Sequence, residues 1–103
     1  MSDDYLMIKR DEIAEIDREI FDLLQERTDL AQAIGEYKAE HGMEVHNPAQ
    51  EARVIERYKA LAQEHGIDAD KAEAIARIVI QIAIDRENSV QKGRTWNTRK
   101  PRD

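Results

Sequence analysis

Apolar residues recur at three- and four-residue steps along the first third of the chain. This spacing is typical of a single apolar stripe on one face of a long helix. We predict a helix from about Tyr5 to Glu40, with residues 1–5 as a frayed lead-in and Gly42 as its terminator. Gly35 lies inside this helix at a cost in stability, which indicates that another backbone passes close to it. The positions that define the stripe are Ile13, Ile16, Ile20, Leu23, Leu24, Leu30, Ala31 and Ile34.

A second, shorter helix follows a brief loop. Asn47 is suited to the N-cap position and Pro48 to the first helical position, with Gln50 reaching back as in a capping box. Apolar residues then continue at helical spacing until Gly66, which marks another stop.

A third helix begins after Asp68, a good N-cap, and is predicted to continue to about Lys92. Beyond it the sequence is basic and polar, without periodicity. The chain is therefore predicted to be all-α, with three helices per chain, one long and two shorter. The predicted helical domain covers residues 1–92, and residues 93–103 are predicted to form a flexible basic tail.

Composition limits the partners. A chain of 103 residues with 37% charged residues makes one small domain, which is too short to bury the stripe of so long a helix. A second copy of the chain is the simplest partner. The net charge of −6 and the lack of a basic run inside the helical region argue against nucleic acid. We find no signal peptide and no stretch of membrane length, so we expect a soluble, cytoplasmic protein without a membrane partner.

Two cations fall on the apolar stripe. Arg27 lies one turn from Leu24 and from Ala31, and Lys38 follows Arg27 by eleven residues, about three turns, so both point to the same side. An inward-facing pair of cations indicates an anionic ligand. The alternative is that both stems cross the stripe and carry their charged heads into water.

A third cation, Arg10, raises a question of distance. It precedes Arg27 by seventeen residues, roughly 25 Å along a straight helix, which no small metabolite spans. If both arginines serve one ligand, they must come from two chains of an antiparallel pair.

Other kinds of site lack their sequence signals. The three histidines fall at helix ends or in a loop without metal-ligand spacing, there is no cysteine, and there is no glycine-rich phosphate loop. We therefore expect no metal and no cofactor. The polar candidates that remain are Arg10, Arg27, Lys38, Glu51, Glu87 and Gln91.

The order of these features resembles the all-helical chorismate mutase family over about residues 6–92. No single feature is specific, but the series at these spacings is a fairly strong signal. The features are Arg10, Ile13 and Ile16-Asp17, then Leu23-Leu24-x-x-Arg27, Leu30-Ala31 and Lys38, then Asn47-Pro48-x-x-Glu51, and finally Ile80-Gln81-Ile82-x-Ile84-Asp85 leading to Gln91.

The resemblance implies an intertwined helical homodimer with two equivalent sites, each completed by Arg10 of the partner chain. It implies the rearrangement of chorismate to prephenate in one pericyclic step, without a cofactor. Arg27 and the partner's Arg10 would bind the two carboxylates of the substrate. Lys38 and Gln91 would donate to the ether oxygen, and Glu51 would accept from the ring hydroxyl.

Two residues depart from the family pattern near the ring-hydroxyl end of the substrate. The family usually has Asp where this chain has Asn47, and Arg where it has Gln50. One interpretation is that Asn47 and Gln50 simply form a good helix cap. Alternatively they bind a substrate changed at that carbon, such as the 4-amino analogue of chorismate.

The third departure concerns spacing. Asp68 to Gln91 is about four residues longer than the family pattern. With an insertion of one turn, Gln91 faces the ether oxygen and Glu87 lines the pocket one turn earlier. Without it, Glu87 takes that position and Ala83 replaces a small polar residue. The Ile-Gln-Ile-x-Ile-Asp run favours Gln91.

Chorismate mutase is the first hypothesis for the function. An aminodeoxychorismate mutase or an isochorismate pyruvate-lyase on the same scaffold is the second. A non-catalytic helical dimerisation module is the third, although such a scaffold has no need of inward charges.

Overall fold

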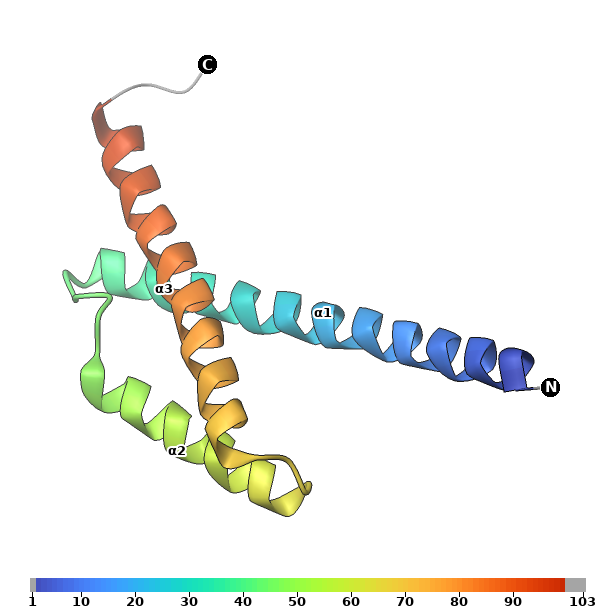
Figure 1. The fold of residues 1–103 in the computed structure, drawn as a ribbon. Helices are drawn as coiled ribbons and strands as arrows, with labels where there is room; N and C mark the ends of the chain where they lie inside the picture. The colour runs from blue at the N-terminus through green and yellow to red at the C-terminus, as the bar shows by residue number, and fades with distance from the viewer. Residues whose placement is uncertain (1, 100–103) are drawn as a thin grey trace. The chain divides into compact units, whose positions relative to one another are not determined.

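The computed structural model describes residues 2–99, and the side chains of residues 3–91. These residues form three helices and no strand, as predicted: α1 (Ser2–Glu40), α2 (Pro48–Glu64) and α3 (Ala69–Arg99) (Figure 1). The chain divides into two units, residues 1–30 and residues 31–103. The first unit is a stretch of α1, and the second holds the end of α1 with α2 and α3.

Two helix limits differ from the prediction. The frayed lead-in is wrong, because α1 is helical from Ser2, where Asp3 and Asp4 place negative charge at the positive end of the helix dipole. Helix α3 continues past Lys92 to Arg99. Gly93 lowers the stability of a helix but alone does not stop it. Residues 100–103 of the predicted tail lie outside the described residues.

The predicted glycine stops are confirmed. Gly42 has φ 64°, and the N–H of Met43 donates to the carbonyl of Lys38 at 2.8 Å, the bond that closes a Schellman motif. Gly66, with φ 68°, ends α2 in the same way.

The N-caps are confirmed as well. Asn47 Oδ1 accepts from the backbone N–H of Gln50 at 3.2 Å, and Asp68 Oδ2 caps α3 from 3.0 Å. The second half of the capping box is wrong. Gln50 Oε1 instead accepts a hydrogen bond from Arg53 Nε at 3.0 Å, one turn along the exposed side of α2.

Helices α2 and α3 pack through small side chains. Val54 and Ala62 of α2 are buried, as are Ala72, Ala76 and Val79 of α3. Ala76 has no exposed surface at all. Small residues let the two helices approach closely, but they bury little apolar area, so this core by itself is modest.

A charged cluster also joins α2 to α3. Glu73 Oε2 accepts from Arg77 Nη2 at 2.7 Å, and Glu73 Oε1 lies 3.9 Å from Lys59 Nζ of α2. The hydrogen bond from Arg77 holds the pKa of the Glu73 carboxyl below its usual range. Whatever stability this interaction contributes is present at neutral pH and is lost as the pH falls through that lowered pKa.

Most of the apolar stripe of α1 is left exposed by this chain, although Ala31 is buried. Leu23 and Leu30 are 64% and 68% exposed, and Ile13, Ile16 and Ile20 are each more than half exposed. A run of large exposed apolar side chains on one helix face is typical of an interaction surface. None of the helices in the described part of the chain is both long enough and apolar enough to span a membrane.

The close approach expected at Gly35 is confirmed, and it fixes how α1 crosses α3 within the second unit. A Cβ atom built on Gly35 would lie 3.0 Å from the Cα of Glu87 and 3.1 Å from its Cγ. Only a glycine allows the two backbones to come this near.

We therefore expect Gly35→Ala to destabilise the fold, although Gly→Ala inside a helix ordinarily stabilises. The propensity gain of about 1 kcal/mol is outweighed by overpacking against a backbone atom, which costs roughly 1–3 kcal/mol. Chemical denaturation followed by circular dichroism measures the change. Ala33→Gly, at an exposed position of α1, is the matched control for propensity alone. A Gly35→Ala protein more stable than wild type would contradict the close approach.

Candidate active site

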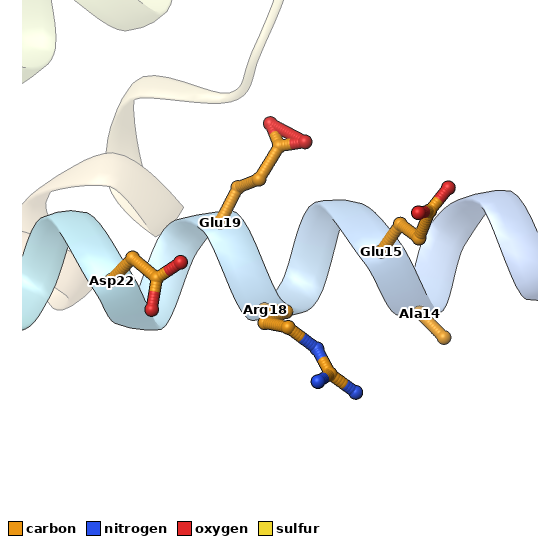
Figure 2. A pocket seen from close by; sticks show the side chains of 5 residues that line it. All are labelled: Ala14, Glu15, Arg18, Glu19 and Asp22. Carbon is orange, nitrogen blue, oxygen red and sulfur yellow. The ribbon is translucent and has the colours of Figure 1, made fainter.

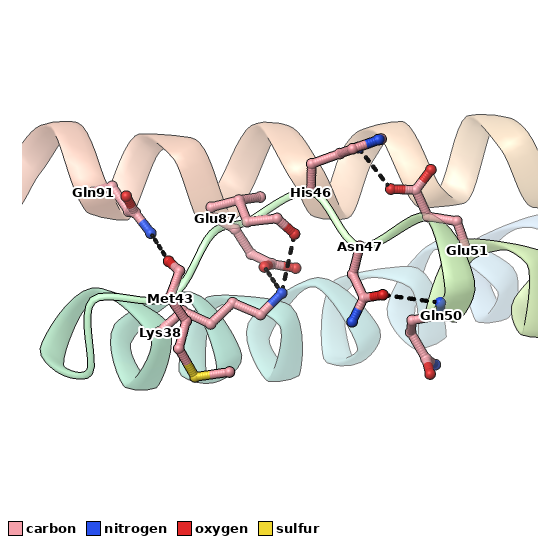
Figure 3. Close-up of polar contacts among 9 residues, drawn as sticks. Lys38, Met43, His46, Asn47, Gln50, Glu51, Glu87 and Gln91 are labelled. Atoms are coloured by element: carbon pink, nitrogen blue, oxygen red, sulfur yellow. Dashed lines mark hydrogen bonds and ion pairs between the residues drawn. The ribbon is translucent and has the colours of Figure 1, made fainter.

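Lys38 is the centre of the polar cluster in the second unit. It lies in the last turn of α1, and its Nζ donates to the carbonyl of Val45 at 3.0 Å and to Glu87 Oε1 at 3.3 Å (Figure 3). The side chains of Lys38 and Glu87 are only 15% and 10% exposed. A cation and an anion held this far out of water require each other, because either alone would be costly to bury.

Glu87 is the α3 residue beside Lys38. Gln91 lies one turn further along α3, where its Nε2 donates to the carbonyl of Met43 at 3.4 Å. Glu87 faces the Lys38 ammonium because the crossing at Gly35 brings its backbone against α1, one turn before Lys38. The geometry therefore favours Glu87, the alternative without an insertion, for the position next to Lys38.

Glu51 lies in the first turn of α2. Its Oε2 lies 3.0 Å from Nδ1 of His46, the residue that precedes the cap (Figure 3). Asn47 and Gln50 are exposed and have the roles already described, in the cap and with Arg53. The structure thus gives both departures from the family pattern an ordinary structural function.

Arg10 and Arg27 lie in residues 1–30, the first unit, whereas Lys38 and Glu87 lie in the second. Helix α1 is unbroken between them, which confirms the premise that roughly 25 Å of helix separates the two guanidinium-bearing positions. Arg10 is exposed. One chain cannot supply both arginines to one small ligand.

A shallow depression on the first unit is a poorer candidate. It is lined by Ala14, Glu15, Arg18, Glu19 and Asp22, all from α1 (Figure 2). Three carboxylates against one guanidinium make this surface unfavourable for a dicarboxylate. A single helix also cannot enclose a ligand.

Metal chemistry has no support among the described residues, where no three His, Cys, Asp or Glu side chains gather in a group that could hold an ion. His41 and His65 contact the carbonyls of Tyr37 and Leu61, one turn back along their helices, at 2.8 and 2.7 Å. These two histidines close helix ends.

Sequence reasoning missed three parts of the cluster. The carbonyls of Met43 and Val45 face the site, and His46 contacts Glu51. Backbone carbonyls carry no sequence signal. The contact of His46 did have one, because residues just before a cap and in the first turn beyond it commonly meet.

The chain is an all-α protein with a cluster of charged and hydrogen-bonding side chains, Lys38, Glu87 and Gln91, held between its helices and a loop. The sequence profile of the family described as chorismate mutase type II matches residues 9–88. The chain belongs to this family.

Two kinds of protein are similar to this chain in sequence. A chorismate mutase of Methanocaldococcus jannaschii is 34% identical over 83 residues, which cover 81% of this chain and 80% of that protein. The T-proteins of Haemophilus influenzae and Enterobacter agglomerans are each 30% identical over 79 residues. These residues cover 77% of this chain but only 21% of the T-proteins, which are much longer.

Proposed function

We propose that this chain is a cytoplasmic chorismate mutase that acts as a homodimer and rearranges chorismate to prephenate. The observation that carries the proposal is the largely buried Lys38–Glu87 pair, in which Lys38 also donates to the loop carbonyl of Val45, in a chain of this family. A buried ion pair is weak evidence for stability, so a pure dimerisation module has little reason to keep one.

The reaction asks little chemistry of the protein. Bonds form and break in one pericyclic step, with no nucleophile and no proton transfer. The site must hold a flexible dicarboxylate in its compact conformer and stabilise the negative charge that grows on the breaking ether oxygen. Positioning and a preorganised cation meet these two needs.

Lys38 is the cation placed for the ether oxygen. An ammonium has three N–H donors, and Val45 and Glu87 take two of them. These two contacts fix the ammonium before the substrate arrives, and the third N–H is directed to the substrate. A donor fixed in advance needs no reorganisation as charge develops.

Glu87 and Gln91 line the same end of the site. Glu87 keeps Lys38 in place through the contact between its Oε1 and the Lys38 ammonium. Gln91, whose bond to the carbonyl of Met43 is long at 3.4 Å, supplies a neutral N–H one turn further on. With Lys38 partly neutralised by Glu87, the two substrate carboxylates depend on arginines for their charge partners.

Those arginines are Arg27 of one chain and Arg10 of the partner. Planar guanidinium groups bind carboxylates through two parallel hydrogen bonds. The exposed stripe of α1 supplies the surface for an antiparallel pair of long helices, and burying it is the driving force for the dimer.

Glu51 accepts from the ring hydroxyl of the substrate. The alternative substrate, with an amino group at that carbon, was suggested by Asn47 and Gln50. Because these residues already serve the helix cap and Arg53, they supply no reason to prefer the amino analogue.

A turnover assay with chorismate, isochorismate and aminodeoxychorismate in parallel tests the proposal. We expect prephenate from chorismate at the highest kcat/KM of the three. Pyruvate release from isochorismate at a higher kcat/KM would assign the lyase function, and preference for the amino compound would assign a functional role to Asn47 and Gln50. Failure to turn over all three would leave the dimerisation module.

A further inference from the structure

The proposed reaction gives a role to Glu51 but none to its contact with His46. Figure 3 shows His46 on the loop before α2, with its ring directed to the Glu51 carboxylate. Nδ1 and Oε2 are 3.0 Å apart. The His46 side chain is 68% exposed, whereas that of Glu51 is 26% exposed, so Glu51 is the partner that faces inward.

The chain holds this pair in place by its local geometry. With Asn47 as N-cap, His46 is the residue before the cap and Glu51 is the fourth helical residue. Apolar side chains at these two positions often pack together as a hydrophobic staple that fixes how the chain enters a helix. Here the same two positions carry an imidazole and a carboxylate.

The contact between His46 and Glu51, a polar staple, also restricts the Glu51 carboxylate. Nδ1 of His46 lies 3.0 Å from Oε2 of Glu51, which leaves Oε1 of Glu51 to accept a hydrogen bond from a ligand. A carboxylate with one oxygen fixed loses less rotational freedom when a ligand binds the other. In the neutral or the protonated imidazole, Nδ1 can serve as the donor.

We infer that His46 is a positioning residue that holds the Glu51 carboxylate in the orientation that accepts the ring hydroxyl of the substrate. This inference rests on the proposed function, since that function gives Glu51 its role. The hydroxyl takes no part in the bonds that form and break, so we expect its contact with Glu51 to strengthen little in the transition state. His46 should therefore affect KM more than kcat.

Steady-state kinetics with chorismate test this for His46→Ala, His46→Gln, Glu51→Ala and the double variant His46→Ala/Glu51→Ala. We expect His46→Ala to raise KM by about three- to tenfold, the range for losing one exposed charge-assisted hydrogen bond, with kcat nearly unchanged. His46→Gln, which keeps an N–H donor, should recover part of the loss. In the Glu51→Ala background, His46→Ala should have no further effect.

His65→Ala is the matched control, because His65 closes the other end of α2 through the carbonyl of Leu61. It should leave KM and kcat as in wild type. An equal rise of KM from His46→Ala in both backgrounds would show a merely structural staple and overturn the inference, as would no change in either.

NMR separates this inference from the proposed function. The Nδ1 resonance of His46 should shift when Glu51 is replaced by Ala, whether or not the protein turns over chorismate. An unchanged resonance would overturn the pair itself. An inactive wild type whose His46 resonance shifts would count against the proposed function, and would leave His46 holding Glu51 without the substrate role inferred here.

Discussion

Lys38→Ala is expected to lower kcat by roughly a hundredfold or more, with a much smaller change in KM. Its ammonium stabilises charge that exists only in the transition state, and loss of one preorganised donor of this kind costs about 10²–10³ in kcat. Steady-state kinetics with chorismate provide the measurement. Near-normal kcat in Lys38→Ala would remove Lys38 from the mechanism.

The same substitution leaves the Glu87 carboxylate without its charge partner. This second effect needs its own control. Removing one partner of a buried pair leaves an uncompensated charge, which destabilises the fold by up to about 3–5 kcal/mol. The double variant Lys38→Ala/Glu87→Gln has no such charge. We expect it to regain stability in chemical denaturation while kcat stays low. Recovery of kcat together with stability would mean that the loss in Lys38→Ala came from misfolding.

Mixing Arg10→Ala with Arg27→Ala should restore activity that neither variant has alone. Each homodimer lacks one arginine in both sites and should be nearly inactive. If each site takes Arg27 from one chain and Arg10 from the other, one site of the heterodimer lacks both arginines. The other site has both of them. Random exchange makes about half of the molecules heterodimers, so roughly a quarter of the wild-type sites should return.

Sedimentation and subunit tagging provide the control, since they establish the dimer and show that exchange has occurred. Were both arginines drawn from the same chain, every site in the mixture would lack one of them. Activity that stays at the level of the variants after verified exchange would therefore refute the shared site. The exposed stripe of α1 predicts a dimer, and a folded monomer at micromolar concentration would refute that prediction.

The local features of this fold were readable from the sequence because each depends on a few neighbouring residues. The stops at Gly42 and Gly66 and the caps at Asn47 and Asp68 are set by one residue and its backbone neighbours within a turn. The period of the apolar residues predicts α1 for the same reason. The separation of Arg10 from Arg27 then follows from helix geometry alone.

The tertiary structure decided which α3 residue faces Lys38. Glu87 and Gln91 are four residues apart, about one turn, so they share a helix face and no period in the sequence distinguishes them. The crossing distinguishes them: Gly35 admits the backbone of α3 at Glu87, and Lys38 follows Gly35 by less than one turn. The contacts of Lys38 with the Val45 carbonyl and of His46 with Glu51 are local, between the end of a helix and the loop beside it. The sequence supplied the residues of this site, and the packing of α1 against α3 set which of them meet, because that choice depends on backbone approach rather than on residue type.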